Sequence, residues 1–108
     1  MRKYNAAVIM QARVGSTRLP GKILREIQGK TVLELDIERC LNIPNADGVV
    51  IATTPEPDAH QIVAVTRKFP TDKVTHFVGP VEDVLARYHG AALSVHASII
   101  IRITSDCP

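Results

Sequence analysis

Glycines, hydroxyl side chains and cations are concentrated in one segment, residues 11–22, which reads QARVGSTRLPGK. Gly15 and Gly21 let the backbone approach a ligand without an intervening Cβ. A glycine-containing loop that follows a strand can also direct successive N–H groups at an anion. The cationic side chains of the segment are Arg13, Arg18 and Lys22. These features predict a phosphate-binding loop, and a solvated basic loop is the alternative.

The two common phosphate-binding motifs do not fit this segment. A Walker A loop requires four residues between its glycines and a hydroxyl residue after its lysine. Here five residues separate Gly15 from Gly21, and Ile23 follows Lys22. The dinucleotide fingerprint G-x-G-x-x-G is absent as well. Any phosphate site in residues 11–22 must therefore follow a different pattern.

Apolar runs separated by helical patterns surround this loop. Strands are predicted at residues 6–10, 48–54, 74–78 and 99–104, and the continuous apolar run at 48–54 is typical of a strand that is buried on both faces. Thr31 and Glu34 have the spacing of a capping box, which predicts a helix that ends before Pro44. A second helix is expected to begin at residues 57–58. Its predicted inward residues are Ala59, Ile62, Val63 and Phe69.

The clearest helical stripe lies between the third and fourth predicted strands. Its apolar members recur at the spacing of one helix face and are Val81, Val84, Leu85, Tyr88, Ala91, Ala92 and Val95. Residues 22–29 show neither a helical nor a strand-like pattern of apolar residues, and they are expected to form an irregular or short extended connection. The whole pattern predicts an α/β fold in which helices cover both faces of a parallel sheet.

This fold predicts where the chemistry lies. Right-handed crossovers and the usual doubly wound arrangement give the strand order 3-2-1-4. The first and fourth strands are then neighbours, so the basic loop and Asp106 leave the same carboxyl edge, where ligands of open α/β sheets bind. Magnesium takes one or two carboxylates plus phosphate oxygens, which makes Asp106 a candidate ligand. The alternative is that Asp106 caps a turn before Pro108.

Composition limits the classes of function. The net charge of +2 argues against a general nucleic-acid binder, although residues 13–30 alone hold five cationic side chains against one carboxylate. No apolar stretch reaches the roughly 18 residues of a membrane span, and no signal peptide is expected. A cytoplasmic protein without membrane association is therefore predicted. Cys40 fits a core position of the first helix, and the histidines at positions 60, 89 and 96 fit exposed helix positions.

Four segments together resemble a known family. Residues 11–22 are similar to the signature loop of sugar-activating cytidylyltransferases, nearest to the spore-coat polysaccharide biosynthesis branch and more distantly to CMP-KDO and CMP-sialate synthetases. Residues 102–108, RITSDCP, match the family's second signature except that Ser105 replaces glycine. Residues 83–88, DVLARY, and residues 52–54, ATT, also fit. The resemblance extends along the whole chain.

The resemblance implies an enzyme that transfers CMP from CTP to a sugar or sugar acid for polysaccharide biosynthesis, with release of pyrophosphate. It implies a Rossmann-like nucleotide-diphospho-sugar transferase fold with three layers, of which this chain holds a truncated form. Arg13, Arg18 and Lys22 would hold the triphosphate, and Asp106 would bind Mg²⁺. The other implied nucleotide contacts are Gln11, Ala12, Gly15, Ser16 and Arg87.

Family members continue for about as long again after the second signature. The resemblance therefore implies that residues 1–108 are the N-terminal, nucleotide-binding half of a cytidylyltransferase domain. It also implies that the sugar pocket, a further metal ligand and much of a homodimer interface lie beyond it. The isolated chain is then expected to be inactive. Two alternatives stay open: a nucleotide-binding module without catalysis, and a structural α/β domain whose fourth strand is covered by a partner.

Overall fold

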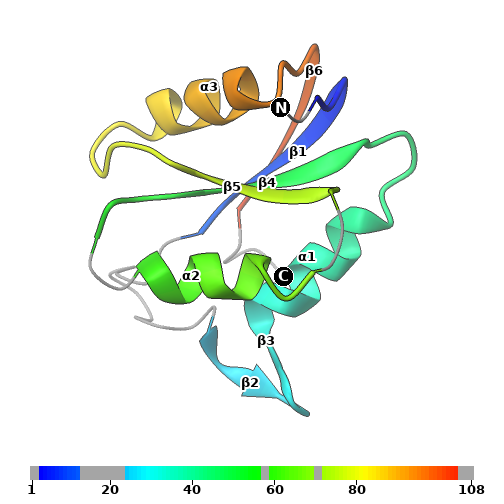
Figure 1. Cartoon of the computed structure of the whole chain (residues 1–108), viewed down its shortest axis with the longest axis vertical. Coiled ribbons are helices and arrows are strands. Elements are labelled where there is room, and N and C mark those ends of the chain that lie inside the picture. Colours follow the sequence, from blue (N-terminus) through cyan, green and yellow to red (C-terminus); the bar gives the residue numbers. More distant parts are fainter. Residues whose placement is uncertain (1–2, 13–23, 57–58, 70–71, 105–108) are drawn as a thin grey trace.

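The computed structural model describes residues 3–12, 24–56, 59–69 and 72–104 (Figure 1). Strands and helices alternate along these residues, as the sequence predicts. The order is β1 (Ala6–Gln11), β2 (Glu26–Ile27), β3 (Lys30–Thr31), α1 (Val32–Leu41), β4 (Gly48–Thr53), α2 (Ala59–Thr66), β5 (Val74–Val78), α3 (Val84–Ser94) and β6 (Ile99–Thr104).

Four of the strands form one parallel sheet in the order β5-β4-β1-β6. This order confirms the predicted 3-2-1-4 arrangement. Strand β1 lies between β4 and β6, and its last residue, Gln11, is in register with Ala52 on one side and Thr104 on the other. The carboxyl ends of these three strands therefore meet at one edge of the sheet.

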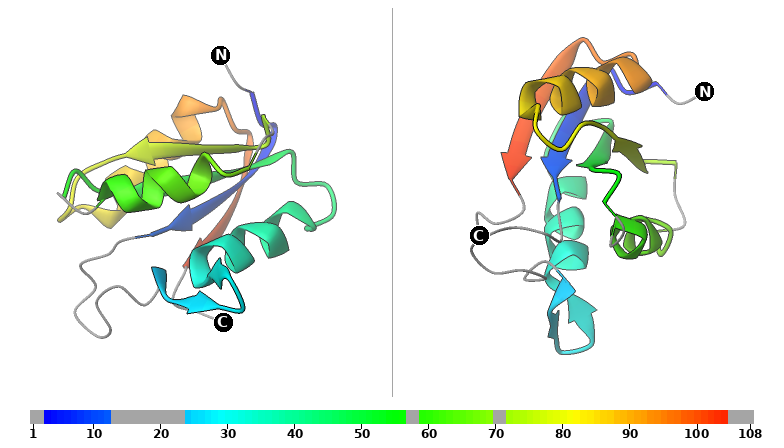
Figure 2. Two further views of the ribbon diagram at one scale, coloured as in Figure 1. Left: turned by 60° about the horizontal axis from the view of Figure 1, so that its bottom comes forward. Right: turned by 90° about the vertical axis from the view of Figure 1, so that its left-hand side faces the viewer.

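The helices form a layer on each face of the sheet. Helix α3 covers one face, and α1 and α2 cover the other (Figure 1); Figure 2 shows the same separation from two further directions. Side chains of β1 alternate between the layers: Val8 and Met10 join the core with α1 and α2, while Ala7 and Ile9 join the core with α3. The residues of β1 up to Met10 and all of β4 are buried, and burial on both faces explains why these two strands read as apolar runs.

Helix α1 begins at its predicted cap. The side-chain oxygen of Thr31 accepts a hydrogen bond of 3.0 Å from the backbone N–H of Glu34. The region before it differs from the prediction, because β2 and β3 pair as a short antiparallel hairpin. Gln28 and Gly29 form its turn with φ of 53° and 88°, the left-handed pair that favours a tight two-residue hairpin. Strands of two residues are too short to produce a periodic signal.

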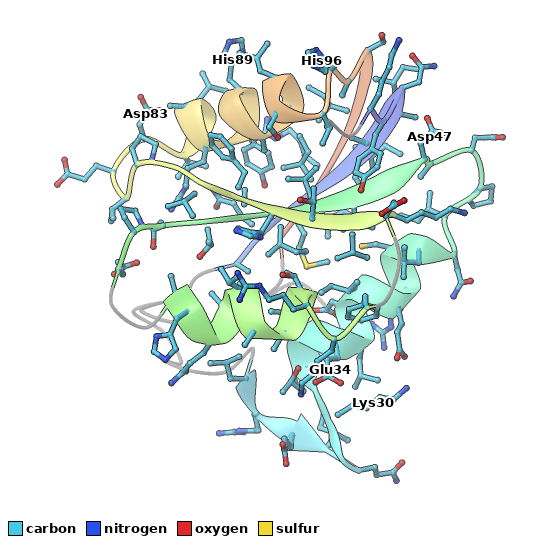
Figure 3. All side chains as sticks on the ribbon, in the orientation of Figure 1. Lys30, Glu34, Asp47, Asp83, His89 and His96 are labelled. Carbon is cyan, nitrogen blue, oxygen red and sulfur yellow. The ribbon has the colours of Figure 1, made fainter. Side chains whose placement is uncertain are left out.

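The predicted inward faces of α2 and α3 need correction. In α2, Ile62 is buried and Ala59, Val63 and Phe69 are half-buried, whereas Val65 and Thr66 are buried and were not predicted. In α3, Val84 and Leu85 are 44% and 70% exposed. The first turn of α3 starts at the border of the sheet, where Figure 3 shows Asp83. Tyr88, Ala91, Ala92 and Val95 are buried, as predicted, and Arg87, which was not assigned to this face, is buried with them.

Candidate functional site

The carboxyl edge of the sheet brings together the segments that the sequence singles out. Residues 13–23 follow β1, and residues 105–108 follow β6. The pairing of Gln11 with Thr104 makes these two exits neighbours. Of the predicted site residues, the structure describes Gln11, Ala12 and Arg87. The others, Arg13, Gly15, Ser16, Arg18, Lys22 and Asp106, lie outside the described residues.

Backbone hydrogen bonds continue the order of the sheet beyond the strand ends. The N–H of Ala12 donates to the carbonyl of Ala52 over 2.9 Å, and the N–H of Gly79 donates to the carbonyl of Thr53 over 2.9 Å. Ala12 is buried, and so are Thr53 and Thr54. The start of the segment after β1 is thus fixed against β4, and the start of the segment after β5 is fixed in the same way.

Arg87 reaches this edge from α3 and contacts Gln11. Its Nε and Nη2 atoms each donate a hydrogen bond of 2.9 Å to the side-chain oxygen of Gln11. The orientation of the amide is assigned from this network, because the reverse orientation would set amide N–H donors against guanidinium donors. Arg87 is only 3% exposed. A cation is therefore held beneath the sheet edge, within hydrogen-bonding distance of the last residue of β1.

The residue after Arg87 contacts the other exit strand. The guanidinium carbon of Arg102, in β6, lies 4.3 Å from the ring centroid of Tyr88, a distance suited to a cation–π interaction. Tyr88 is buried. Consecutive residues of α3 thus contact the segment at the end of β1 and the segment in β6. Described residues from three of the four stretches that carry the sequence resemblance therefore lie together: Gln11, Arg87 with Tyr88, and Arg102.

Comparisons with known proteins agree with this geometry. The family model for cytidylyltransferases matches residues 7–108. The chain belongs to the cytidylyltransferase family. The spore coat polysaccharide biosynthesis protein SpsF of Bacillus subtilis is 36% identical over 109 residues, which cover 93% of this chain and 42% of that protein.

Solved cytidylyltransferase structures share the fold. A cytidylyltransferase from Leptospira borgpetersenii superposes with a TM-score of 0.86 at 36% identity, covering 96% of this chain and 42% of that one. The CMP:2-keto-3-deoxy-manno-octonic acid synthetase complexed with CTP gives a TM-score of 0.75 at 26% identity, with coverages of 93% and 39%. These neighbours confirm the Rossmann-like α/β fold. The chain spans about two fifths of the length of the cytidylyltransferases it matches.

The pairing of Gln11 with Arg87 was not predicted, although both residues were candidates. They lie on elements far apart in the sequence, so no local spacing relates them. The available signals were a polar residue at the end of an apolar strand and a cation inside the inward stripe of α3. Thr53 belongs to the ATT segment that resembles the family, but it was not predicted as a site residue. Its side-chain oxygen is buried and has no hydrogen-bond partner in the described part of the chain.

Other reactive side chains in the described residues do not form a competing site. Cys40 is buried in the core, and burial, together with the nearby carboxylate of Asp36, raises its pKa to about 11. The histidines at positions 60, 89 and 96 are exposed, as predicted. Figure 3 shows His89 on α3 and His96 just after the C-terminal end of α3. Among residues 3–12, 24–56, 59–69 and 72–104, no group of three or more His, Cys, Asp or Glu could hold a metal.

None of the helices in the described ranges is long and apolar enough to cross a bilayer.

Proposed function

We propose that this chain binds CTP for an enzyme that transfers CMP to a sugar or sugar acid of surface polysaccharide biosynthesis, with release of pyrophosphate. Family membership supports nucleotidyl transfer. The solved relative complexed with CTP and the similarity to a spore coat polysaccharide protein support the nucleotide and the pathway class. The observation that carries the proposal is the register of Gln11 with Thr104, since it makes the exits of the basic loop and of the Asp106 segment adjacent.

The basic loop is assigned to the triphosphate. Arg13, Arg18 and Lys22 would neutralise the phosphate charge, and the backbone at Gly15 and Ser16 would supply N–H donors. Gln11 and Ala12, at the end of β1, would contact the nucleoside. This order along the chain, with the nucleoside contacts before the phosphate contacts, fits a nucleotide that lies across the carboxyl edge.

The reaction is a displacement at the α-phosphorus of CTP. The acceptor hydroxyl oxygen forms a bond to this phosphorus and loses its proton, while the bond to the bridging oxygen of the β-phosphate breaks and pyrophosphate leaves. Positioning and charge stabilisation supply most of the catalysis in such a step. Arg13, Arg18 and Lys22 would stabilise the charge that develops on the leaving group.

A magnesium ion is proposed as the cofactor, with Asp106 as a ligand. One carboxylate together with phosphate oxygens is a donor set that suits this hard cation. Asp106 follows Thr104 closely in the sequence, and Thr104 is in register with Gln11 at the end of β1. When bound, the ion would polarise the α-phosphate oxygens and orient the triphosphate. A homodimer of the complete enzyme stays a prediction from the sequence resemblance.

Charge-removing variants test the loop assignment. We expect Arg18→Ala and Lys22→Ala each to weaken CTP binding by about 1–3 kcal/mol, the usual cost of deleting a charge-assisted hydrogen bond. Binding would be measured by titrating ¹⁵N-labelled protein with CTP and following amide shifts by NMR, which also detects weak affinity. Lys30→Ala is the matched control, because Lys30 has the same charge but pairs with Glu38 at 2.7 Å in the β2–β3 hairpin region.

Nucleotide choice and turnover complete the test. CTP is expected to stabilise the protein more than UTP, ATP or GTP in thermal unfolding with magnesium. A larger shift with ATP would point to another nucleotidyltransferase branch. Unchanged CTP affinity in both loop variants would show that residues 11–22 are not the phosphate site. CTP binding without pyrophosphate release by the complete enzyme, for any sugar acid tested, would favour a nucleotide-binding module, whereas the isolated chain is expected to be inactive on either reading.

A further inference from the structure

The contact between Arg87 and Gln11 has a consequence for the chemistry of the Gln11 amide. A glutamine amide offers one acceptor oxygen and two N–H donors, and an isolated amide can present either end to a ligand. Here the oxygen is occupied by two donors of a single guanidinium, each at 2.9 Å. Guanidinium has donors only, so its contact with the oxygen commits the nitrogen of Gln11 to the donor role elsewhere.

Arg87 is itself held in place by close packing. The side chain is 3% exposed, and Gly79 lies directly against it, since a Cβ at position 79 would come within 2.7 Å of Arg87 Cγ. Phe77 adjoins the same position, at 3.2 Å from that Cβ. On the other flank of Phe77, Gly90 of α3 leaves room for the ring. An arginine confined in this way offers a fixed pair of donors, which is the condition for orienting a neighbouring side chain.

The position of Gln11 connects this orientation to ligand choice. Gln11 is the last residue of β1, and its side chain lies on the α3 side of the sheet. The residues that follow it form the basic loop assigned to the phosphates. A nucleotide whose phosphates lie on that loop would place its base near the carboxyl ends of β1 and β4, within reach of the Gln11 amide.

We propose that Arg87 is a positioning residue that orients the Gln11 amide so that its nitrogen donates a hydrogen bond to N3 of a bound cytosine. This inference rests on the function proposed above. Cytosine presents acceptors at N3 and O2, whereas uracil presents an N–H donor at N3. An amide fixed as a donor therefore accepts cytosine and meets a donor in uracil. The pair formed by Arg87 and Gln11 sets the preference for CTP over UTP.

Two variants test the proposal, one at Gln11, which donates to the base, and one at Arg87, which orients Gln11. Gln11→Glu keeps the shape and provides oxygens for Arg87, but it removes the N–H donor. Arg87→Lys keeps the cation, but a lysine cannot supply two donors in a fixed fork. CTP and UTP affinities of each variant would be measured by NMR titration, and the readout is their ratio. Gln61→Glu, at an exposed position of α2, is the matched control for the added charge.

The expected result is a loss of discrimination. The CTP-to-UTP affinity ratio should fall by about 5- to 30-fold in both variants, the factor that corresponds to 1–2 kcal/mol, and should not change in the control. Gln11→Glu will lower both affinities through charge repulsion, which the ratio removes. The side-chain NH₂ resonances of Gln11 should also shift in Arg87→Lys without any nucleotide, because the amide loses its fixed partner.

The possible failures are distinguishable. If the unmodified chain does not bind CTP, the proposed function fails, and this inference fails with it. If the chain prefers CTP and both folded variants keep the same ratio, only the inference is overturned. If Arg87→Lys does not fold, Gln11→Glu decides alone: an unchanged ratio rejects the proposal, and a reduced ratio supports it.

Discussion

Gly79 and Arg87 are in direct contact, and the absence of a side chain at position 79 is what allows it. A Cβ at Gly79 would lie 2.7 Å from Arg87 Cγ and 3.2 Å from Arg87 Cα. Neither atom is the free end of a flexible chain, so Arg87 would have to move. Gly79 also donates its N–H to the carbonyl of Thr53, which prevents the backbone from retreating freely. The glycine therefore fixes where the guanidinium of Arg87 lies.

Gly79→Ala should thus be destabilising and should also affect the site. Overpacking of this kind costs about 1–3 kcal/mol, which urea unfolding followed by circular dichroism would measure. Displacement of Arg87 should also reduce the preference for CTP over UTP. Gly29→Ala is the control: a Cβ there meets nothing within 4 Å, and φ is +88°. Its cost, about 1–2 kcal/mol, is conformational, so nucleotide preference should not change. If Gly79→Ala keeps the same preference for CTP over UTP as Gly29→Ala, the role assigned to Gly79 is wrong.

Cys40 is predicted to be chemically inert in the folded protein. Burial raises the pKa of its thiol from an ordinary value of 9.0 to about 11, and the Asp36 carboxylate contributes. The reactive thiolate at pH 8 is then about 100-fold rarer than in the unfolded chain. Iodoacetamide labelling, with peptide mapping to separate Cys40 from Cys107, should show this protection, and 8 M urea should remove it. Labelling of Cys40 at the same rate in both conditions would show that the thiol is accessible.

The ion pair between Glu34 and Lys68 should make a small, pH-dependent contribution to stability. Lys68 Nζ lies 2.9 Å from Glu34 Oε1 and links α1 to the end of α2. This hydrogen bond, more than any other interaction, lowers the pKa of Glu34 below its ordinary value of 4.5. A carboxyl group with a depressed pKa stabilises the fold above its unfolded pKa, and this contribution is lost as the pH falls through the folded pKa.

Glu34→Gln tests this contribution by comparison across pH. The variant should be slightly less stable than the unmodified chain at pH 7. The difference should shrink as the pH falls through the folded pKa of Glu34, which lies below its ordinary value of 4.5, because the carboxyl group is then protonated in the folded and the unfolded chain alike. Lys68 is 60% exposed, so solvent screening keeps the effect small. Urea unfolding at pH 7 and over a series of acidic pH values is the measurement. A difference in stability that does not shrink with falling pH would mean that packing, or the capping of α1 by Thr31, and not the charge, is responsible.

The strand pattern made the sheet and its order predictable. Four predicted strands with helices between them are compatible with few topologies, and the chain adopts the common one. The β2–β3 hairpin escaped prediction because its strands have two residues each. Val84 and Leu85 were predicted to face inward but are exposed, for a different reason. Helical spacing identifies a face, but it does not tell where a helix passes the border of the sheet.

The site was predictable in its location but not in its contacts. The edge where Gln11 meets Thr104 follows from strand order. The hydrogen bonds from Arg87 to Gln11 depend instead on Gly79 and Phe77, which shape the space around Arg87. Such a contact involves residues from three elements, and its physical cause is steric. Nothing in the composition of a single segment contains that information.

Asp106 provides the last prediction, because it separates the metal from the basic loop. If Asp106 binds magnesium, Asp106→Asn removes the charge that holds a hard cation while keeping the size of the side chain. CTP affinity would be measured with 5 mM magnesium and with EDTA, by NMR titration. In the unmodified chain, magnesium should strengthen binding by a charge-assisted interaction worth about 1–3 kcal/mol. In Asp106→Asn this gain should vanish, and the metal-independent binding by the loop cations should remain.

The carboxyl edge offers a matched control for this substitution. Asp83 lies at the same edge and caps α3, its Oδ1 accepting a hydrogen bond of 3.0 Å from the N–H of Ala86. Asp83→Asn removes the same charge and keeps a residue that caps helices well. Magnesium should therefore increase the CTP affinity of Asp83→Asn as much as that of the unmodified chain.

If both variants lose this increase in CTP affinity, negative charge at this edge acts at a distance. Retention of the gain in Asp106→Asn would exclude Asp106 as the ligand, because an amide side chain cannot replace a carboxylate for this cation without loss of affinity.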